Sequence, residues 1–356
     1  MRILMVARRY PPDVRSGTET VFENLVAQAK KSHEVRLLVG WRNSEQGLPA
    51  DARRVQLRGA ASWPTLAAAA LREAAEFRPD LVLSNSIEVW VPGLLNAIIV
   101  HDLNFGGTSR TSGAGMAVRA REAFYRFRGR QAAILAVSEA TRQRLLEIGI
   151  PEKNLHLVRN GVDLERFVPR PPPGQEPLRL VYPSRILPGK AQHLAIDAVG
   201  RLRPEQRRRV HLSIVGAVAD PIYADRLRIQ SFKQPVDFAF DVPDIVPFYQ
   251  NADIVLFPTL MEEGFGYTAI EAMACGRPVI WSEQPAIREA TGGIGLPVPP
   301  DDADALRHAI WKLVENPALR LQMGEEGRRF VEARYGWESV WRRYEEIFAR
   351  LRGRPG

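Results

Sequence analysis

The chain has 356 residues, 45% of them hydrophobic and 25% charged, which fits one large or two medium globular α/β domains. Its single cysteine, Cys275, excludes a disulfide scaffold and favours a reducing compartment, and no run approaches the roughly 18 apolar residues of a membrane span. The net charge of +8 favours an anionic partner (a nucleotide, a phospholipid or lipid phosphate, or a nucleic acid), although scattered arginines are also typical of an arginine-rich genome. Because a predicted strand opens the chain, we expect no signal peptide and a cytoplasmic location.

Strands and helices alternate along residues 1–168, which we predict to form one Rossmann-like domain. Thr18 or Thr20 is a candidate cap for the first helix, and Ser138 for a helix that Glu139 opens and Gly149 ends. The loop after the first strand lacks GxGxxG, which excludes the usual dinucleotide fingerprint. The predicted order is strand 2–7, helix 20–30, strand 33–40, strand 55–59, helix 63–77, strand 80–85, strand 95–103 and strand 133–138.

Two features of this half are candidate ligand contacts. His101 ends a predicted buried strand, at the edge where open α/β sheets bind ligands, although a lone histidine is more often structural. Residues 113–130 form a basic helical segment whose arginines alternate with aromatic residues. Such a helix can lie on an anionic membrane or hold a phosphorylated acceptor, or it can simply be half-buried with a solvated arginine face. Nucleic acid is disfavoured because no nucleic-acid motif accompanies the charge. The candidate acceptor contacts on this helix are Arg119 and Arg126.

The proline-rich run 169–177 is the predicted linker, because it cannot form a regular element. A second Rossmann-like domain is predicted at 178–336, followed by an amphipathic helix in 337–356. Arg185 and Lys190 follow its first strand, where a guanidinium and an ammonium suit a diphosphate. Asp302-Ala303-Asp304 has the D-x-D form of a metal–nucleotide motif, but we interpret these acids as the cap of a helix.

Residues 253–281 combine a strand, a glycine-rich turn, a helix and a second strand. Such a turn is an anion site, because the N–H groups and the dipole of the helix point at it. Glu263 lies just before the helix and Glu271 about a turn inside it. Each carboxylate can accept two hydrogen bonds, which suits the hydroxyls of a sugar or a ribose. An ordinary βα turn with surface acids near a helix N-terminus explains the turn alone equally well.

The stretch E-G-F-G-Y-T-A-I-E-A-M-A-C-G-R-P-V-I resembles the glutamate-x7-glutamate motif of the retaining glycosyltransferases of the GT-B fold, family 4 (glycosyl transferases group 1). A second match runs from Ala133 to Pro169. Its last part, Asn160 to Pro169, resembles N-G-V-D-x-x-x-F-x-P of that family, with a structural role before the linker. The family has R-x(4)-K-G where this chain has Arg185 and Lys190, but here Gly189 precedes the lysine instead of following it. The resemblance covers nearly the whole chain.

The resemblance implies an α/β protein of GT-B fold, with two Rossmann-like domains whose parallel sheets face a central cleft. It implies acceptor binding in the first domain, nucleotide-sugar binding in the second, and a last helix that crosses back to the first. The implied reaction transfers a hexosyl group from a nucleoside diphosphate sugar to an acceptor hydroxyl with retention, in polysaccharide, lipopolysaccharide or glycolipid assembly. The donor is a substrate, so no cofactor and no metal is expected. The expected partners are a sugar or lipid-linked acceptor and an anionic membrane surface, with no nucleic acid.

Carried onto this chain, the resemblance assigns roles to individual residues. His101 would help to place the donor sugar, Glu263 would hold sugar hydroxyls and Glu271 the ribose. Arg185 and Lys190 would stabilise the departing diphosphate together with the helix amides of the turn. Asp102 would orient His101 or bind the acceptor. The implied donor contacts are Gly17, Gly216, Val242, Gly264, Phe265, Gly266, Tyr267, Thr268 and Glu271.

Two other functional classes stay open from the sequence. A GT-B-fold nucleotide-sugar epimerase would form its product from the donor alone. A non-catalytic membrane-binding or nucleic-acid-binding protein would have lost the chemistry of the site, which the presence of Arg185, Lys190, Glu263 and Glu271 argues against. The donor sugar, its base, the acceptor and the oligomeric state are not predicted. Retention without a well-placed nucleophile suggests a front-face reaction, in which the leaving phosphate takes the acceptor proton.

Overall fold

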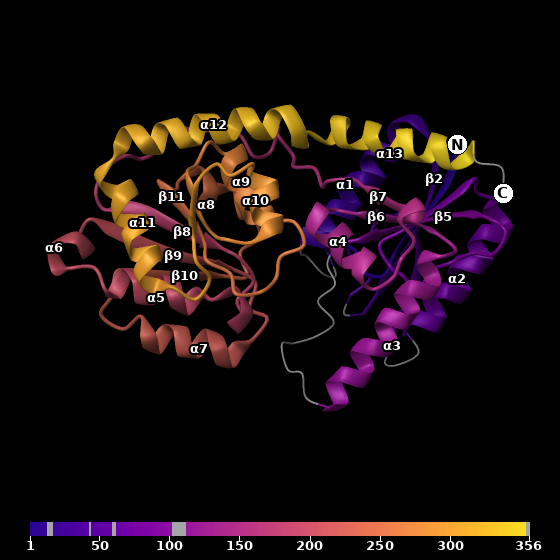
Figure 1. Cartoon of the computed structure of the whole chain (residues 1–356), viewed down its shortest axis with the longest axis horizontal. Coiled ribbons are helices and arrows are strands. Elements are labelled where there is room, and N and C mark those ends of the chain that lie inside the picture. The colour runs from indigo at the N-terminus through magenta and orange to yellow at the C-terminus, as the bar shows by residue number, and fades with distance from the viewer. Residues whose placement is uncertain (13–16, 43, 59–61, 102–111, 354–356) are drawn as a thin grey trace. The chain divides into compact units, whose positions relative to one another are not determined.

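The chain divides into two compact units in a computed structural model, which describes residues 1–12, 17–42, 44–58, 62–101 and 112–353 (Figure 1). The first unit joins Met1–Gly161 to the C-terminal segment Trp337–Gly356, and the second is Val162–Gly336. In each unit a parallel sheet is covered by helices, which confirms the prediction of two Rossmann-like α/β domains. The predicted cleft between them stays a prediction, and Asp102 lies outside the described residues.

The sheet of the first unit has the order β3-β2-β1-β4-β5-β6-β7, with every pair parallel. β1 is central because its residues from Ile3 to Ala7 are apolar on both faces and fully buried. The strands are β1 (Arg2–Ala7), β2 (Glu34–Trp41), β3 (Arg53–Gln56), β4 (Leu81–Ser84), β5 (Leu95–Val100), β6 (Ala133–Ala136) and β7 (Leu155–Leu157).

Helices of the first unit bury apolar stripes against this sheet. In α1 (Gly17–Ser32) the buried positions Val21, Phe22, Leu25, Val26 and Ala29 recur at helical spacing. Thr18 and Thr20 lie inside α1, so the prediction that either caps it is wrong. The Ser138 hydroxyl accepts a hydrogen bond from the Thr141 amide, which confirms the predicted cap. The other helices are α2 (Ser62–Phe77), α3 (Ser112–Gly129), α4 (Glu139–Glu147), the short η2 (Glu152–Asn154) and α13 (Trp337–Arg352).

The sheet of the second unit has the order β10-β9-β8-β11-β12-β13, again with parallel pairs only. The chain builds outward from β8 to β10 and then returns to β11 on the other side of β8. Ligands bind at such a switch point, beyond the carboxyl ends of the strands. The strands are β8 (Leu178–Pro183), β9 (Val210–Gly216), β10 (Val236–Phe240), β11 (Ile254–Phe257), β12 (Val279–Ser282) and β13 (Leu296–Val298).

The helices of the second unit follow the predicted alternation. Asp302 caps α11 by accepting a hydrogen bond from the Ala305 amide, as predicted for the D-x-D sequence. The predicted linker 169–177 contains no helix or strand and belongs to this unit. The helices are η3 (Pro188–Lys190), α5 (Gln192–Gly200), α6 (Pro204–Arg207), α7 (Pro221–Gln230), α8 (Val246–Gln250), α9 (Tyr267–Ala274), α10 (Pro285–Thr291), α11 (Ala303–Glu315) and α12 (Pro317–Tyr335).

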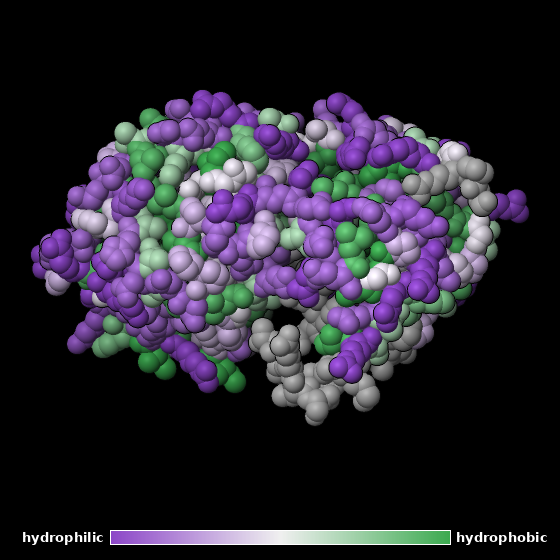
Figure 2. All heavy atoms as spheres, viewed as in Figure 1, coloured by the Kyte–Doolittle hydropathy of each residue, from purple (hydrophilic) through white to green (hydrophobic). Residues whose placement is uncertain are grey.

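Most residues visible on the surface are hydrophilic, and hydrophobic residues appear there as separate patches (Figure 2). Cys275 is fully buried, at the end of α9. Among the described residues, no helix is both long enough and apolar enough to cross a bilayer.

Candidate functional site

The strongest candidate site lies at the switch point of the second sheet, where the segments after β8 and β11 meet. Lys190 ends η3 after β8, and Glu263 lies in the turn between β11 and α9. Their side chains form a close ion pair and are only 13% and 14% exposed. The Thr259 hydroxyl donates to the same carboxylate oxygen over 3.1 Å. Two predicted site residues far apart in the chain are therefore in direct contact.

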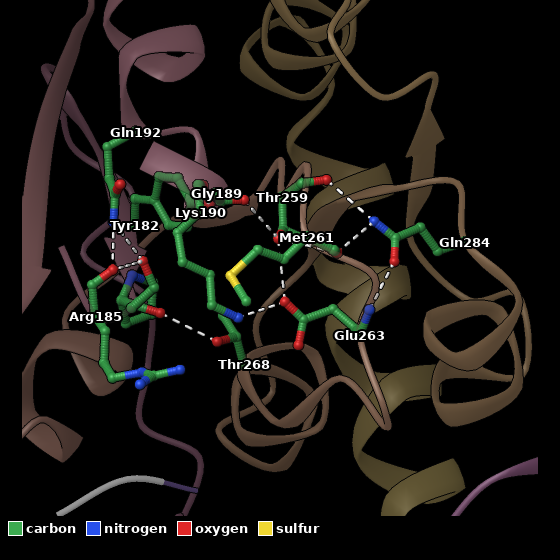
Figure 3. Close-up of polar contacts among 12 residues, drawn as sticks. Tyr182, Arg185, Gly189, Lys190, Gln192, Thr259, Met261, Glu263, Thr268 and Gln284 are labelled. Atoms are coloured by element: carbon green, nitrogen blue, oxygen red, sulfur yellow. Dashed lines mark hydrogen bonds and ion pairs between the residues drawn. The ribbon is translucent and has the colours of Figure 1, made fainter. Parts of the chain in front are cut away.

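The backbone around this ion pair is held by a side-chain amide that the sequence analysis did not single out. The Glu263 amide donates to Gln284 Oε1 over 3.0 Å, and Gln284 Nε2 donates to the carbonyls of Thr259 and Met261, over 3.2 and 2.9 Å. Figure 3 shows Gln284 facing the turn from the opposite side to Lys190. Three hydrogen bonds from one side chain thus fix the turn that carries Glu263.

Gly189 precedes Lys190 in this chain, whereas the family has its glycine after the lysine. Its carbonyl accepts hydrogen bonds from the amides of Leu260 and Met261, over 2.9 and 2.8 Å. A Cβ atom at Gly189 would lie 2.3 Å from Met261 Cγ, so the two turns pass too closely for a side chain. Ala191, directly after the lysine, has a left-handed backbone with a φ of 57°. Glycine before Lys190 thus leaves room for the Met261 side chain, while alanine occupies the left-handed position after the lysine.

Arg185 and the start of α9 provide further groups for an anion. The Arg185 side chain is exposed, and among the described residues no carboxylate pairs with it (Figure 3). Gly266 begins α9 with a φ of 107°, and no side chain caps the helix there. The Thr268 hydroxyl donates to the Pro183 carbonyl over 3.1 Å, which ties α9 to the end of β8. A guanidinium and an uncapped helix N-terminus can together bind phosphate groups.

Glu271 lies inside α9 and contacts a tyrosine that has no sequence signal. The Tyr249 hydroxyl, from α8, donates to Glu271 Oε2 over 2.6 Å. Burial raises the pKa of Glu271 to about 7, and the bond from Tyr249 only partly opposes this rise. Burial, reinforced by Glu271, also keeps the pKa of Tyr249 well above its usual value. The carboxyl is therefore poised between its two protonation states near neutral pH.

Several predicted donor contacts lie around the same edge of the sheet in structural roles. Gly216 ends β9 with a φ of 143°, and a Cβ atom there would lie 2.0 Å from the Ser184 carbonyl oxygen. Phe265 is 4% exposed, with its ring 5.6 Å from that of Tyr335, so its side chain belongs to the core. Val242 is half-buried beyond β10. Gly264 and Tyr267 complete the turn, half-buried beside Phe265.

The remaining predicted site residues within the described part of the chain belong to the first unit. Burial lowers the pKa of His101 to about 4, so its imidazole is neutral at pH 7, and no described residue bonds to its buried Nε2. Gly17 opens α1, and Arg119 and Arg126 are exposed on α3. The predicted role of each in binding stays a prediction.

The first sheet also has a switch point, between β1 and β4, and a charged cluster follows both strands there. Arg8 pairs with Glu88 over 3.4 Å and donates to the Ser62 hydroxyl over 3.3 Å. Ser86 donates to the second oxygen of Glu88 over 2.5 Å. This cluster could not be predicted from the sequence, because its members are isolated polar residues with no motif around them.

Comparison with known families divides the chain in the same way. A model described as Glycosyltransferase Family 4 matches residues 15–166, and one described as Glycosyl transferases group 1 matches residues 177–316. The residues described around the Lys190–Glu263 ion pair all fall within the second match.

Two curated relatives are mannosyltransferases. An MMP alpha-(1->4)-mannosyltransferase of Mycolicibacterium hassiacum is 30% identical over 230 residues, which is 61% of this chain and 55% of that protein. The chain thus spans about half the length of that relative. A GDP-mannose-dependent alpha-(1-6)-phosphatidylinositol monomannoside mannosyltransferase of Mycolicibacterium smegmatis is 26% identical over 382 aligned positions, with 98% of both chains covered.

Solved structures with a similar fold include a complex with UDP and a glycosyltransferase. Anabaena Alr3699/HepE in complex with UDP has a TM-score of 0.80 at 18% identity, with 98% of this chain and 100% of that chain covered. WaaG, a glycosyltransferase involved in lipopolysaccharide biosynthesis, has a TM-score of 0.76 at 17% identity, with coverage of 99% and 100%. These likenesses show the GT-B fold. The two family matches place this chain in glycosyltransferase family 4, among the glycosyl transferases group 1.

Proposed function

We propose that this glycosyltransferase moves a hexosyl group from a nucleoside diphosphate sugar to an acceptor hydroxyl, with retention at the anomeric carbon. The observation that carries the proposal is the Lys190–Glu263 ion pair, held at the switch point of the second sheet beside Arg185 and the start of α9. A carboxylate for sugar hydroxyls and cations for a diphosphate are thereby brought to one place.

The leaving diphosphate sets the electrostatic demand of this reaction. Negative charge grows on it as the bond to the sugar breaks, so groups aimed at that charge lower the barrier. The unpaired guanidinium of Arg185 and the N–H groups at the start of α9 would bind it, and no metal is required in this proposal. Lys190 would share its charge between the diphosphate and Glu263, which keeps the carboxylate ionised and oriented for the sugar.

Retention would follow from attack on the face that the diphosphate leaves. The acceptor hydroxyl would pass its proton to a leaving phosphate oxygen, so that no protein nucleophile is needed. His101, neutral at pH 7, could hydrogen-bond the donor sugar without adding a charge. The anomeric configuration of the product, measured by NMR with an anomerically defined donor, tests this step directly, since an inverted product would contradict it.

The donor and acceptor classes are proposed from the relatives. The Mycolicibacterium smegmatis relative uses GDP-mannose and a phosphatidylinositol monomannoside by its name, and it matches this chain along 98% of its length. We therefore propose a lipid-linked or glycolipid acceptor, which the enzyme would reach as a peripheral protein on the cytoplasmic face of a membrane. Polysaccharide and lipopolysaccharide assembly stay within the same proposal.

The first test is a thermal-shift screen against UDP, GDP, dTDP and ADP, alone and as sugar conjugates. A ligand at about 100 times its dissociation constant adds about 2.7 kcal/mol of stability to the form that binds it. We expect one nucleotide to raise the melting temperature of the native protein clearly. We expect Arg185→Ala and Glu263→Gln to reduce sugar transfer by at least about a hundredfold, because in this proposal both would contact the reacting groups. If both variants transferred sugar like the native protein, the proposed site would be wrong, and a product formed from donor alone would indicate an epimerase.

A further inference from the structure

The most exposed large hydrophobic side chains of the described chain are gathered in one segment of the second unit. Ile222 and Ile229 of α7 are 69% and 77% exposed, and Phe232, in the turn that follows, is 75% exposed. The next in rank, Leu321 of α12, is 58% exposed and isolated from them in sequence. Figure 2 shows hydrophobic residues at the lower edge of the second unit, where Figure 1 places α7. A concentration of this kind marks an interaction surface.

The helix is held on its other side, so the exposed residues are not a loosely packed core. Tyr223, Ala224 and Leu227 are buried against the unit, and the Tyr223 hydroxyl donates to His193 Nδ1 or accepts from it over 2.8 Å. Asp220 caps the helix by accepting a hydrogen bond from the Tyr223 amide over 2.9 Å. α7 is thus a fixed helix with apolar residues on its buried side and the two isoleucines on its exposed side.

Cations are interleaved with these apolar residues. Arg226 lies between the two isoleucines at spacings that place all three on one helix face. Lys233 follows Phe232, with its ammonium 5.3 Å from the centre of the ring. Neither cation forms an ion pair with a described residue, whereas the acid of the segment, Asp225, pairs with Arg228 over 2.7 Å. We call Ile222, Arg226, Ile229, Phe232 and Lys233 the α7 face.

The mixture of groups identifies the kind of partner. Apolar side chains beside unpaired cations suit the boundary between lipid headgroups and acyl chains, where both are satisfied at once. A symmetric contact with a second copy would bring the same cations against each other, which costs energy. Nucleic acid would use the cations but would leave the isoleucines in water. Charge and hydrophobicity together therefore favour an anionic bilayer.

We propose that the α7 face docks the second unit of this protein on an anionic lipid bilayer. The idea rests on the proposed function in one respect, since a lipid-linked acceptor presents its sugar at such a surface. It differs from the predicted membrane contact of α3, which belongs to the first unit and has Arg119 and Arg126 exposed. Because α3 is a second basic surface, vesicle binding alone does not identify α7, and the test must report on the α7 face itself.

The test uses a polarity-sensitive fluorophore attached to the full-length variant Ile229→Cys. The native thiol, Cys275, is fully buried and does not compete for the label. Vesicles of phosphatidylcholine with about 30% phosphatidylglycerol should shift the emission of the label to the blue at low salt, and high salt should weaken the effect. The matched control is Leu321→Cys with the same label, which we expect to stay in water. No shift at Ile229, or equal shifts at both positions, would overturn the proposal.

Unlabelled variants measure the contribution of the face by co-sedimentation with the same vesicles. We expect the triple change Ile222→Ser, Ile229→Ser and Phe232→Ser to weaken binding at least tenfold, because each residue loses an apolar contact. Arg226→Gln with Lys233→Gln should weaken it about tenfold, while Leu321→Ser should leave it unchanged. Equal binding by the triple variant would overturn the proposal. So would a concentration-dependent dimer that the triple variant abolishes, since it would assign the face to a second copy.

The nucleotide screen separates this proposal from the proposed function. The α7 variants touch no proposed donor contact, so they should keep the nucleotide-induced rise in melting temperature. Nucleotide binding without a shift of the label would overturn the docking face alone. A shift of the label in a protein that binds no nucleotide would support the face and contradict the donor site.

Discussion

The chemistry of Glu271 depends strongly on its surroundings. Its half-buried carboxyl accepts a hydrogen bond from the Tyr249 hydroxyl, and burial raises its pKa to about 7. A cation paired with the carboxylate would lower that pKa. The charge of Arg166 acts in this direction, but it is the smallest of the contributions to the pKa. A bound ribose would add hydrogen bonds to the charged form and so pull the pKa back down. Binding of a nucleotide and loss of a proton should therefore be coupled at this residue.

The change Glu271→Gln should make the stability of the protein less dependent on pH. The pKa of Glu271 rises from 4.5 to about 7 on folding, so the native state keeps this proton up to a higher pH than the unfolded state does. Its stabilising contribution is complete below pH 4.5 and is lost as the pH rises through 7. Between pH 4.5 and pH 7, the free energy of unfolding of the variant should therefore rise by at most about 3 kcal/mol relative to that of the unsubstituted protein. Urea unfolding at several pH values measures this, with the exposed Glu325→Gln as control, and parallel pH profiles for native and variant would contradict it.

Single residues also show the limit of motif matching. Arg185, Lys190 and Glu263 could be named from the sequence because each lies in a turn after a predicted strand and matches a motif of the family that the chain resembles. Tyr249 could not, because a tyrosine in the short helix α8 carries no local pattern that points to a carboxyl on α9. The contact joins the helix before β11 to the helix after it, so it depends on how α8 and α9 pack beside that strand.

At the scale of elements, hydrogen bonds from two sides hold the turn from Thr259 to Glu263. On one side, the Gly189 carbonyl accepts hydrogen bonds from two of its amides. On the other, the Gln284 side chain forms three hydrogen bonds with it. Turns of this kind would otherwise move, because few apolar contacts hold them. The bonds from both sides explain how an exposed edge of a sheet can keep Glu263 against Lys190.

The change Gln284→Ala should therefore affect turnover more than stability. Loss of the three hydrogen bonds should cost roughly 1–3 kcal/mol of unfolding free energy. A shift of Glu263 by about 1 Å can reduce the rate about a hundredfold, so we expect kcat/KM to fall between tenfold and a hundredfold. Steady-state kinetics and thermal unfolding measure the two effects. The exposed Gln322→Ala on α12 serves as control, and equal kinetics for both variants would show that Gln284 does not hold the turn.

At the scale of the whole molecule, the two ends of the chain complete one unit. α13 packs on α1, with the His33 ring 5.9 Å from that of Trp341 and a hydrogen bond of 3.1 Å from Ser32 to Glu345. Trp341 stacks on Tyr344 along its buried face, and Phe348 meets both rings edge to face. The first unit therefore depends on residues that are translated after the whole of the second.

The change Phe348→Ala tests this dependence. Phe348 is fully buried, so the cavity should cost about 3–5 kcal/mol, and the loss should fall on the first unit. Hydrogen exchange followed by mass spectrometry should show faster exchange in β1, β2 and α1, with β11 and β12 unchanged. Arg343→Gln on the exposed face of α13 should have little effect, because its ion pair with Glu346 is a surface pair. Faster exchange spread evenly over both units would contradict the division of the chain.

What the sequence by itself determined is local or repeated. Strands, helices, the caps at Ser138 and Asp302, two Rossmann-like domains and the family are readable because they depend on neighbouring residues or on motifs of fixed spacing. Only the tertiary structure decided which side chains meet. Lys190 and Glu263 are 73 residues apart in the chain, and Gln284 lies 21 residues beyond Glu263. Such contacts follow from the order of strands in the sheet, and a polar residue that acts across that distance leaves no periodic trace in the sequence. The outward face of α7 was missed for a related reason, since exposure is a property of packing and not of composition.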